Sequence, residues 1–262
     1  MKCSCVALTL AVAVLLCGCR AKSPKGGDSA GAKELLLFCG AGIRPPVEAL
    51  IETFGREHNV EIVTDYAGSE VLLSKIKLSR RGDLYMPGDR HYLEQAASQG
   101  MIILQQPVCY LIPTILVQKG NPKNVCTLHD LLRSGLKVGL GDPNACAIGK
   151  KTREILAKNR ISWQDIDKNV AFLSLTVDEL GMQVQARSLD AVIVWDAVAH
   201  YYADYGQEIP IPVENNVISS VDVGVLSFTV NRALAEEFVE FAASERARAI
   251  FKKHFYRVDP PQ

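Results

Sequence analysis

Apolar residues alternate along the chain between short runs and helically spaced series, which predict strands and helices in turn. Residues 35–38, 60–63 and 83–86 are short apolar segments of the kind that form buried parallel strands. Residues 47–54 and 71–76 place apolar side chains at helical spacing between these segments. This strand–helix order indicates a mainly parallel sheet with helices on both faces.

The same alternation restarts in the second half of the chain. Extended apolar segments at 108–118 and near 209–212 read as crossings between two lobes, and the residues in between supply further strands at 137–140 and 190–194. We therefore expect an α/β protein with two lobes, each a mainly parallel sheet flanked by helices, joined by a two-segment hinge. The predicted boundaries are 34–110 plus 219–262 for lobe 1 and 111–218 for lobe 2.

The amino terminus predicts export and lipid attachment. An apolar stretch from residue 6 to 16 fits the core of a secretory signal and is short for a membrane-spanning helix. It ends in Leu16-Cys17-Gly18-Cys19, which resembles a bacterial lipobox with Cys19 as the lipidated residue. We expect residues 1–19 to be a lipoprotein signal peptide with its lipidation site. Residues 20–33, rich in Gly, Ser, Ala and Lys, are expected to be a flexible tether to the membrane.

The composition and the absence of known catalytic motifs reduce the number of functions to consider. The 29 basic residues balance the 29 acidic ones, so net charge gives no reason to expect nucleic-acid binding. The sequence contains no Gly-x-Ser-x-Gly, His-Glu-x-x-His, phosphate-loop or CxxC motif, and its five histidines lack metal-ligand spacing. These observations predict a protein that is not an enzyme and carries no cofactor. The four cysteines beyond the lipobox are expected to be buried free thiols.

Four glycine-bearing or polar turns fall where predicted strands meet helix starts. They are FCGAGIRPP, YAGSEVLL, GDPNACAIGKKTREIL and VIVWDA. Open α/β sheets bind ligands at such positions. Glycines let backbone N–H groups approach an anion closely, and helix N-termini add partial positive charge. Ser69 adds a hydroxyl donor where the second helix begins.

With these turns in order, residues 35–256 resemble the molybdate-binding proteins of ABC transporters. The matching pattern comprises the first strand and loop, the Gly-Ser helix start, Gly82-Asp83, Gly88-Asp89 and Gly141-Asp142-Pro143 through Gly149. The resemblance implies a type II periplasmic-binding-protein fold that closes on a molybdate or tungstate dianion. It also implies ligand contacts at Gly42, Ser69, Ile148, Val177 and Trp195, with Ala41, Arg44 and Ala147 as possible additional contacts.

The chain departs from this family at three of the implied contacts. Gly42 stands where many relatives carry serine, Trp195 replaces the usual tyrosine, and Ala147-Ile148 replaces a Pro-Ala pair. The resemblance further implies delivery of the oxyanion to an ABC permease by a monomeric, membrane-anchored lipoprotein outside the cytoplasm. No metal is expected beyond the metal of the oxyanion itself.

Alternative ligands and functions remain open at this point. Sulfate, phosphate or ferric iron could occupy the same fold, and a secreted enzyme or an adhesive lipoprotein would be a different class. Phosphate would favour an inward carboxylate from Glu70, Asp142, Asp178 or Asp196, because a protonated oxyanion needs an acceptor. Iron would draw on the adjacent Tyr201-Tyr202 pair, although neighbours on a helix project in different directions.

Overall fold

The computed structural model describes residues 33–261, and its first sheet comes from the two ends of that range. Its five strands lie in the order β2-β1-β3-β10-β4. Their bounds are β1 Lys33–Gly40, β2 Val60–Ala67, β3 Leu84–Met86, β4 Ile102–Leu111 and β10 Ser219–Leu226. We call this sheet and the helices on it the first lobe.

The middle of the chain forms a second five-stranded sheet in the order β7-β6-β8-β5-β9. Its strands are β5 Pro113–Gln118, β6 Val138–Gly141, β7 Val170–Ser174, β8 Ala191–Trp195 and β9 Gly206–Pro210. We call this sheet and its helices the second lobe. The lobe boundaries expected from the sequence remain a prediction, although β4 and β10 each reach to within one residue of them.

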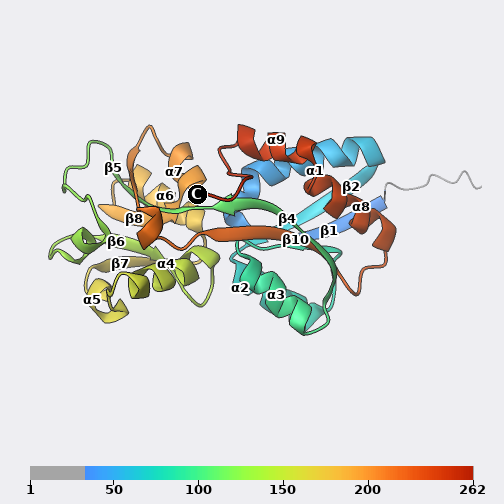
Figure 1. Cartoon of the computed structure of the whole chain (residues 1–262), viewed down its shortest axis with the longest axis horizontal. Coiled ribbons are helices and arrows are strands. Elements are labelled where there is room, and N and C mark those ends of the chain that lie inside the picture. The colour runs from blue at the N-terminus through green and yellow to red at the C-terminus, as the bar shows by residue number, and fades with distance from the viewer. Residues whose placement is uncertain (1–32, 262) are drawn as a thin grey trace, which may run out of the picture. The chain divides into compact units, whose positions relative to one another are not determined.

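Helices cover both faces of each sheet (Figure 1). In the first lobe, α1 (Arg44–His58), α8 (Arg232–Ala242) and α9 (Glu245–Lys253) lie on one face, and α2 (Ser69–Ser79) and α3 (Arg90–Ser98) on the other. In the second lobe, α4 (Ala147–Lys158) and α5 (Trp163–Asp167) lie opposite α6 (Val177–Gln185) and α7 (Asp196–Tyr201). Short 3₁₀ segments η1 (Ala41–Ile43), η2 (Leu128–Leu132) and η3 (Val213–Asn215) complete the described elements. The expected α/β fold with two helix-flanked sheets is confirmed.

Each sheet has one strand that runs against the other four. In the first sheet β1, β2 and β3 are parallel, and β10 pairs antiparallel with both β3 and β4. In the second, β5 pairs antiparallel with β8 and β9, while β6 is parallel to β7 and β8. The reversed strands are the two that begin directly after the chain crosses between lobes. The sheets are therefore mainly parallel, with reversal confined to the crossings.

Several elements differ from the expectations drawn from the pattern of apolar residues. The helix expected from about residue 150 begins at Ala147, and β7, α5 and α6 were not expected as elements. The closing amphipathic stretch divides into α8 and α9 because the Ser244 side chain accepts a hydrogen bond from the Ala247 amide and begins a new helix.

The expected signal peptide, Cys19 and nearly all of the tether lie outside the described residues. Among residues 33–261, no helix is both long and apolar enough to cross a bilayer.

Candidate functional site

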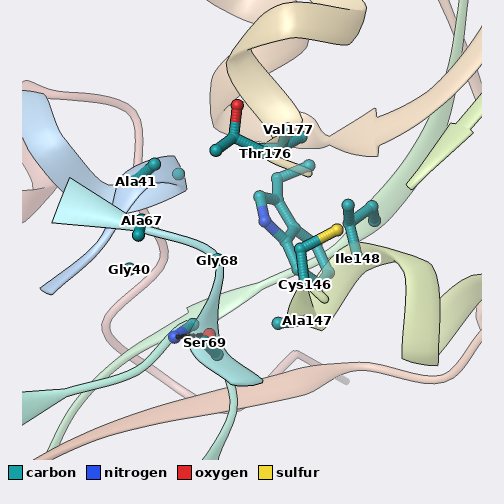
Figure 2. A pocket seen from close by; sticks show the side chains of 13 residues that line it. Gly40, Ala41, Ala67, Gly68, Ser69, Cys146, Ala147, Ile148, Thr176 and Val177 are labelled. Atoms are coloured by element: carbon teal, nitrogen blue, oxygen red, sulfur yellow. Dashed lines mark hydrogen bonds between the residues drawn. The ribbon is translucent and has the colours of Figure 1, made fainter. Parts of the chain in front are cut away.

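A small cavity lies where helices from both lobes begin. Its lining comes from four stretches of chain and two single residues: Gly40, Ala41, Gly42, Ala67, Gly68, Ser69, Gly88, Cys146, Ala147, Ile148, Thr176, Val177 and Trp195. The volume open to the centre of a water molecule is about 20 Å³. Sites for drug-sized ligands are ~300–1,000 Å³, so this cavity suits only a ligand of a few atoms. Figure 2 shows the lining residues gathered around it.

The cavity sits at the carboxyl ends of strands, where an open α/β sheet exposes its helix starts. Strands β1, β2 and β8 end at Gly40, Ala67 and Trp195, each of which lines the cavity. Strand β6 ends at Gly141, and the loop after it leads to Cys146 at the start of α4. The turns that follow these buried apolar strands therefore all lie around the same cavity.

The helices that begin at this cavity have no side-chain cap. The N-cap residues of α2, α4 and α6 are Gly68, Cys146 and Thr176, all of which line the cavity, and none of their side chains accepts a hydrogen bond from the helix. Helix α7 also begins at a lining residue, Trp195, without a cap, but its first two amides donate to the Ile112 carbonyl and the Asp196 carboxylate. Among the helices that begin farther away, α5, α9 and η2 are capped by a side chain and α8 is not. The first N–H groups of a helix lack intrahelical partners. Three sets of such donors therefore surround the cavity, where the helix dipoles favour negative charge.

Ser69 presents a hydroxyl donor at the start of α2. Its Oγ accepts a hydrogen bond from the Gly88 amide at 3.0 Å, and the side chain is 2 % exposed. Because this contact uses a lone pair and not the proton, the hydroxyl can still donate to a ligand. The Gly88 contact also fixes where Oγ lies.

Gly42 and Trp195 share one wall of the cavity. A Cβ on Gly42 would lie 2.6 Å from Val177 Cγ1 and 3.0 Å from the Trp195 indole nitrogen. A larger residue fits at position 42 only if the Val177 side chain and the indole both move, so the serine that the family resemblance implies here would strain this wall. The Trp195 side chain is 2 % exposed, and its indole N–H is a donor without acceptor capacity.

Among residues 33–261, none that lines the cavity carries a charged side chain. Cys146 is its one ionisable residue, and burial raises the pKa of this thiol to about 12. The thiol therefore stays neutral at physiological pH. Lining amides, the Ser69 hydroxyl and the Trp195 indole offer donors, and none of the described lining residues has a carboxylate that could accept a proton from a ligand.

The four carboxylates beside the predicted contacts lie outside this lining. Asp142 accepts a hydrogen bond from the Asn144 amide at 2.8 Å, and Asp196 accepts from the Ala197 amide at 2.9 Å. Burial raises the pKa of Asp178 to about 6, partly offset by the positive charge of Arg44. Glu70 lines a separate surface groove. The inward carboxylate that phosphate would favour is thus not among the described lining residues.

Residues of the two lobes contact each other around the cavity. The Glu70 amide of α2 donates to the Ala145 carbonyl oxygen at 3.1 Å. Gly68 approaches so closely that a Cβ there would lie 2.5 Å from that oxygen. Farther out, Lys151 Nζ of α4 lies 3.0 Å from Asp89 Oδ2 at the start of α3, with both side chains largely buried. The described conformation is therefore a closed one.

The structure brings together every principal residue expected from the sequence. Gly42, Ser69, Ile148, Val177 and Trp195 all line the cavity, as do Ala41 and Ala147. Their contacts with a ligand remain a prediction. Arg44 does not line the cavity: it is exposed, and its guanidinium lies 4.2 Å from the centroid of the Tyr66 ring.

Six of the lining residues were not predicted from the sequence, namely Gly40, Ala67, Gly68, Gly88, Cys146 and Thr176. Five of them lie within the glycine-bearing turns or the Gly88-Asp89 motif, so proximity to those motifs could have found them. Thr176 precedes a helix that was not expected, and no such signal pointed to it.

The tyrosine pair considered for iron lies elsewhere. Tyr201 Oη is 3.0 Å from His254 Nδ1, and Tyr202 Oη donates to the Asp178 carbonyl at 3.3 Å. Neither residue lines the cavity. Within residues 33–261, no group of three or more His, Cys, Asp or Glu side chains is arranged to hold a metal ion.

The chain belongs to the bacterial extracellular solute-binding protein family, whose pattern matches residues 35–257. It is 24 % identical over 250 residues to the molybdate-binding protein ModA of Mycobacterium tuberculosis, covering 94 % of this chain and 93 % of that one. Family and relatives are solute-binding proteins, which supports the expectation that the chain is not an enzyme.

Two solved structures have the same fold. The periplasmic molybdate-binding protein of Azotobacter vinelandii matches with a TM-score of 0.68 at 16 % identity, covering 87 % of this chain and 100 % of that one. The sulfate-binding protein SubI of M. tuberculosis matches with a TM-score of 0.74 at 18 % identity, covering 87 % and 88 %. These likenesses confirm the expected type II periplasmic-binding-protein fold.

Proposed function

We propose that the protein captures a fully deprotonated tetrahedral oxyanion, molybdate or tungstate, outside the cytoplasm and delivers it to an ABC importer. The observation that carries the proposal is the convergence of three uncapped helix starts on a small cavity whose described lining residues are all uncharged. A dianion without protons requires donors only, and this cavity offers donors from both lobes.

The absence of a lining carboxylate sets the order of preference among ligands. A phosphate species that carries a proton would leave that proton without an acceptor in the described lining, which costs binding free energy. Sulfate, like molybdate, carries no proton at neutral pH, and the related fold of SubI makes it the principal competitor. Ferric iron would need anionic or imidazole ligands, and the Tyr201-Tyr202 pair lies away from the cavity.

Closure of the lobes is the step that binding would drive. The ligand stabilises the closed form only by contacts that the open form lacks. In this protein those contacts come from α2 in the first lobe and α4 and α6 in the second. We further propose that Cys19 carries a lipid, that residues 20–33 tether the binding unit to the membrane, and that a monomer docks on a permease.

Isothermal titration calorimetry against molybdate, tungstate, sulfate and phosphate tests the proposal. We expect one-site, tight binding of molybdate and tungstate, with sulfate weaker and phosphate weakest. Tighter binding of phosphate than of either metal oxyanion, or no heat with any of the four, would refute it.

A further inference from the structure

Two buried tyrosines hold the backbone behind the cavity. Tyr85, on β3, donates from Oη to the Ser69 carbonyl oxygen at 2.8 Å. Tyr256, which follows α9, donates to the Gly42 carbonyl oxygen at 2.6 Å. Both side chains are at most 2 % exposed, and neither lines the cavity. Each tyrosine thus contacts a cavity residue from the side away from the ligand.

These hydroxyls act as donors under all physiological conditions. Burial raises the pKa of both tyrosines well above the usual value, so neither loses its proton. A phenol has one proton, and in each case it has a single acceptor among the described residues. A buried hydroxyl or carbonyl left without its partner is costly, which makes both contacts persistent.

The acceptors are carbonyl groups whose direction matters for an anion. A backbone carbonyl oxygen carries partial negative charge, so a carbonyl turned into the cavity would repel a dianion. The Tyr256 hydroxyl holds the Gly42 carbonyl toward a residue outside the lining. The Ser69 carbonyl already points along α2, because Ser69 is the first residue of that helix, and the Tyr85 hydroxyl is a second donor that fixes this peptide group.

The Ser69–Glu70 peptide group is held at both ends. Its carbonyl accepts from Tyr85, and its N–H donates to the Ala145 carbonyl of the second lobe at 3.1 Å. Rotation of this peptide would break the contact between lobes as well as redirect the carbonyl. Tyr85 therefore supports both the start of α2 and closure.

We infer that Tyr85 and Tyr256 are positioning residues for anion binding: Tyr256 keeps the Gly42 carbonyl oxygen turned away from the bound oxyanion, and Tyr85 fixes the Ser69–Glu70 peptide group at the start of α2. This inference rests on the proposed function. Groups behind a binding site that orient those in contact with the ligand commonly change affinity about 10- to 100-fold in metal sites. The same logic applies to a site built from backbone donors.

The test compares three Tyr→Phe variants, each of which removes only a hydroxyl. Tyr85→Phe and Tyr256→Phe should each raise the molybdate dissociation constant on the order of tenfold. Tyr202→Phe is the matched control, because its hydroxyl also donates to a backbone carbonyl, that of Asp178, which does not line the cavity. Its dissociation constant should equal that of the wild type.

Thermal unfolding of the anion-free variants separates positioning from general loss of stability. Because Tyr85→Phe and Tyr202→Phe each remove one hydroxyl that donates to a backbone carbonyl, their melting temperatures should fall by similar amounts, while only Tyr85→Phe should lose affinity. Wild-type protein that binds none of the oxyanions would refute the proposed function. Two results would overturn this inference alone, provided that the wild-type protein binds. In the first, Tyr85→Phe and Tyr256→Phe bind molybdate as tightly as the wild type. In the second, all three Tyr→Phe variants lose the same affinity.

Discussion

Gly68→Ala adds one methyl group where the two lobes meet. Gly68 has φ −63° and ψ 145°, a conformation that alanine adopts freely, so each lobe should fold as before. In the closed form the new Cβ would lie 2.5 Å from the Ala145 carbonyl oxygen and 2.6 Å from that of Leu175. Both carbonyl oxygens belong to the backbone, so neither can rotate away as the end of a side chain could. The variant therefore obstructs closure while leaving the open protein unaffected.

The magnitude follows from the contacts. A carbon and a carbonyl oxygen approach to about 3.3–3.6 Å, so the lobes must separate by about 1 Å, which breaks the hydrogen bond from the Glu70 amide to Ala145. Losing that bond costs about 0.5–1.5 kcal/mol, and residual overlap costs about 1–3 kcal/mol. A total of about 1.5–4.5 kcal/mol corresponds to a rise of about 10- to 2,000-fold in the dissociation constant.

Calorimetry with molybdate, paired with thermal unfolding of the anion-free protein, measures both halves of this prediction. Affinity should fall while the anion-free melting temperature stays unchanged. Gly120→Ala is the control: Gly120 has φ +77° with no atom within 4 Å of an added Cβ, so strain should lower stability and leave affinity intact. Wild-type affinity in Gly68→Ala would refute the closed cavity as the binding site.

Three further predictions concern single side chains. Ser69→Ala removes one hydrogen bond to a charged ligand, worth about 1.5–3 kcal/mol, and calorimetry should show a rise of about 10- to 160-fold in the dissociation constant. Lys151→Met leaves the Asp89 carboxylate uncompensated in the closed form, so affinity should fall at least about tenfold; adding Asp89→Asn, which keeps a capping side chain, should restore part of it. The pKa of Asp178 is raised to about 6 by burial, so its contribution to stability is lost as pH rises from about 4 through 6. Asp178→Asn should therefore flatten the melting temperature over that range and raise it at pH 7–8; a variant that follows the wild-type profile would contradict this.

The sequence predicted the positions of the cavity turns better than the elements around them. Gly42 and Ser69 follow buried apolar strands, and a strand–turn–helix unit places its turn at the carboxyl edge of the sheet whatever the rest of the lobe does. That local rule sufficed to bring turns from both lobes together, because each lobe repeats it.

Other features depended on contacts between distant residues. β7 reads as VAFLS, an apolar run of the kind that predicts a strand although it was not among the expected elements, and it lies at the sheet edge with Val170 and Phe172 only partly buried. Tyr85 looked like part of a buried strand, and its hydrogen bond to Ser69 follows from packing between β3 and α2. The close approach of Gly42 to the Trp195 indole brings together residues more than 150 positions apart, and no local pattern in the sequence reveals it.

The location of the bound anion tests the central claim most directly. Crystals grown with tungstate would show it by anomalous diffraction at the tungsten absorption edge, because the metal is the strongest scatterer present. We predict one strong peak inside the cavity, with the tungstate oxygens around it within hydrogen-bonding reach of the first amides of α2, α4 and α6. A principal peak outside that cavity, or an anion beside a carboxylate, would contradict the account.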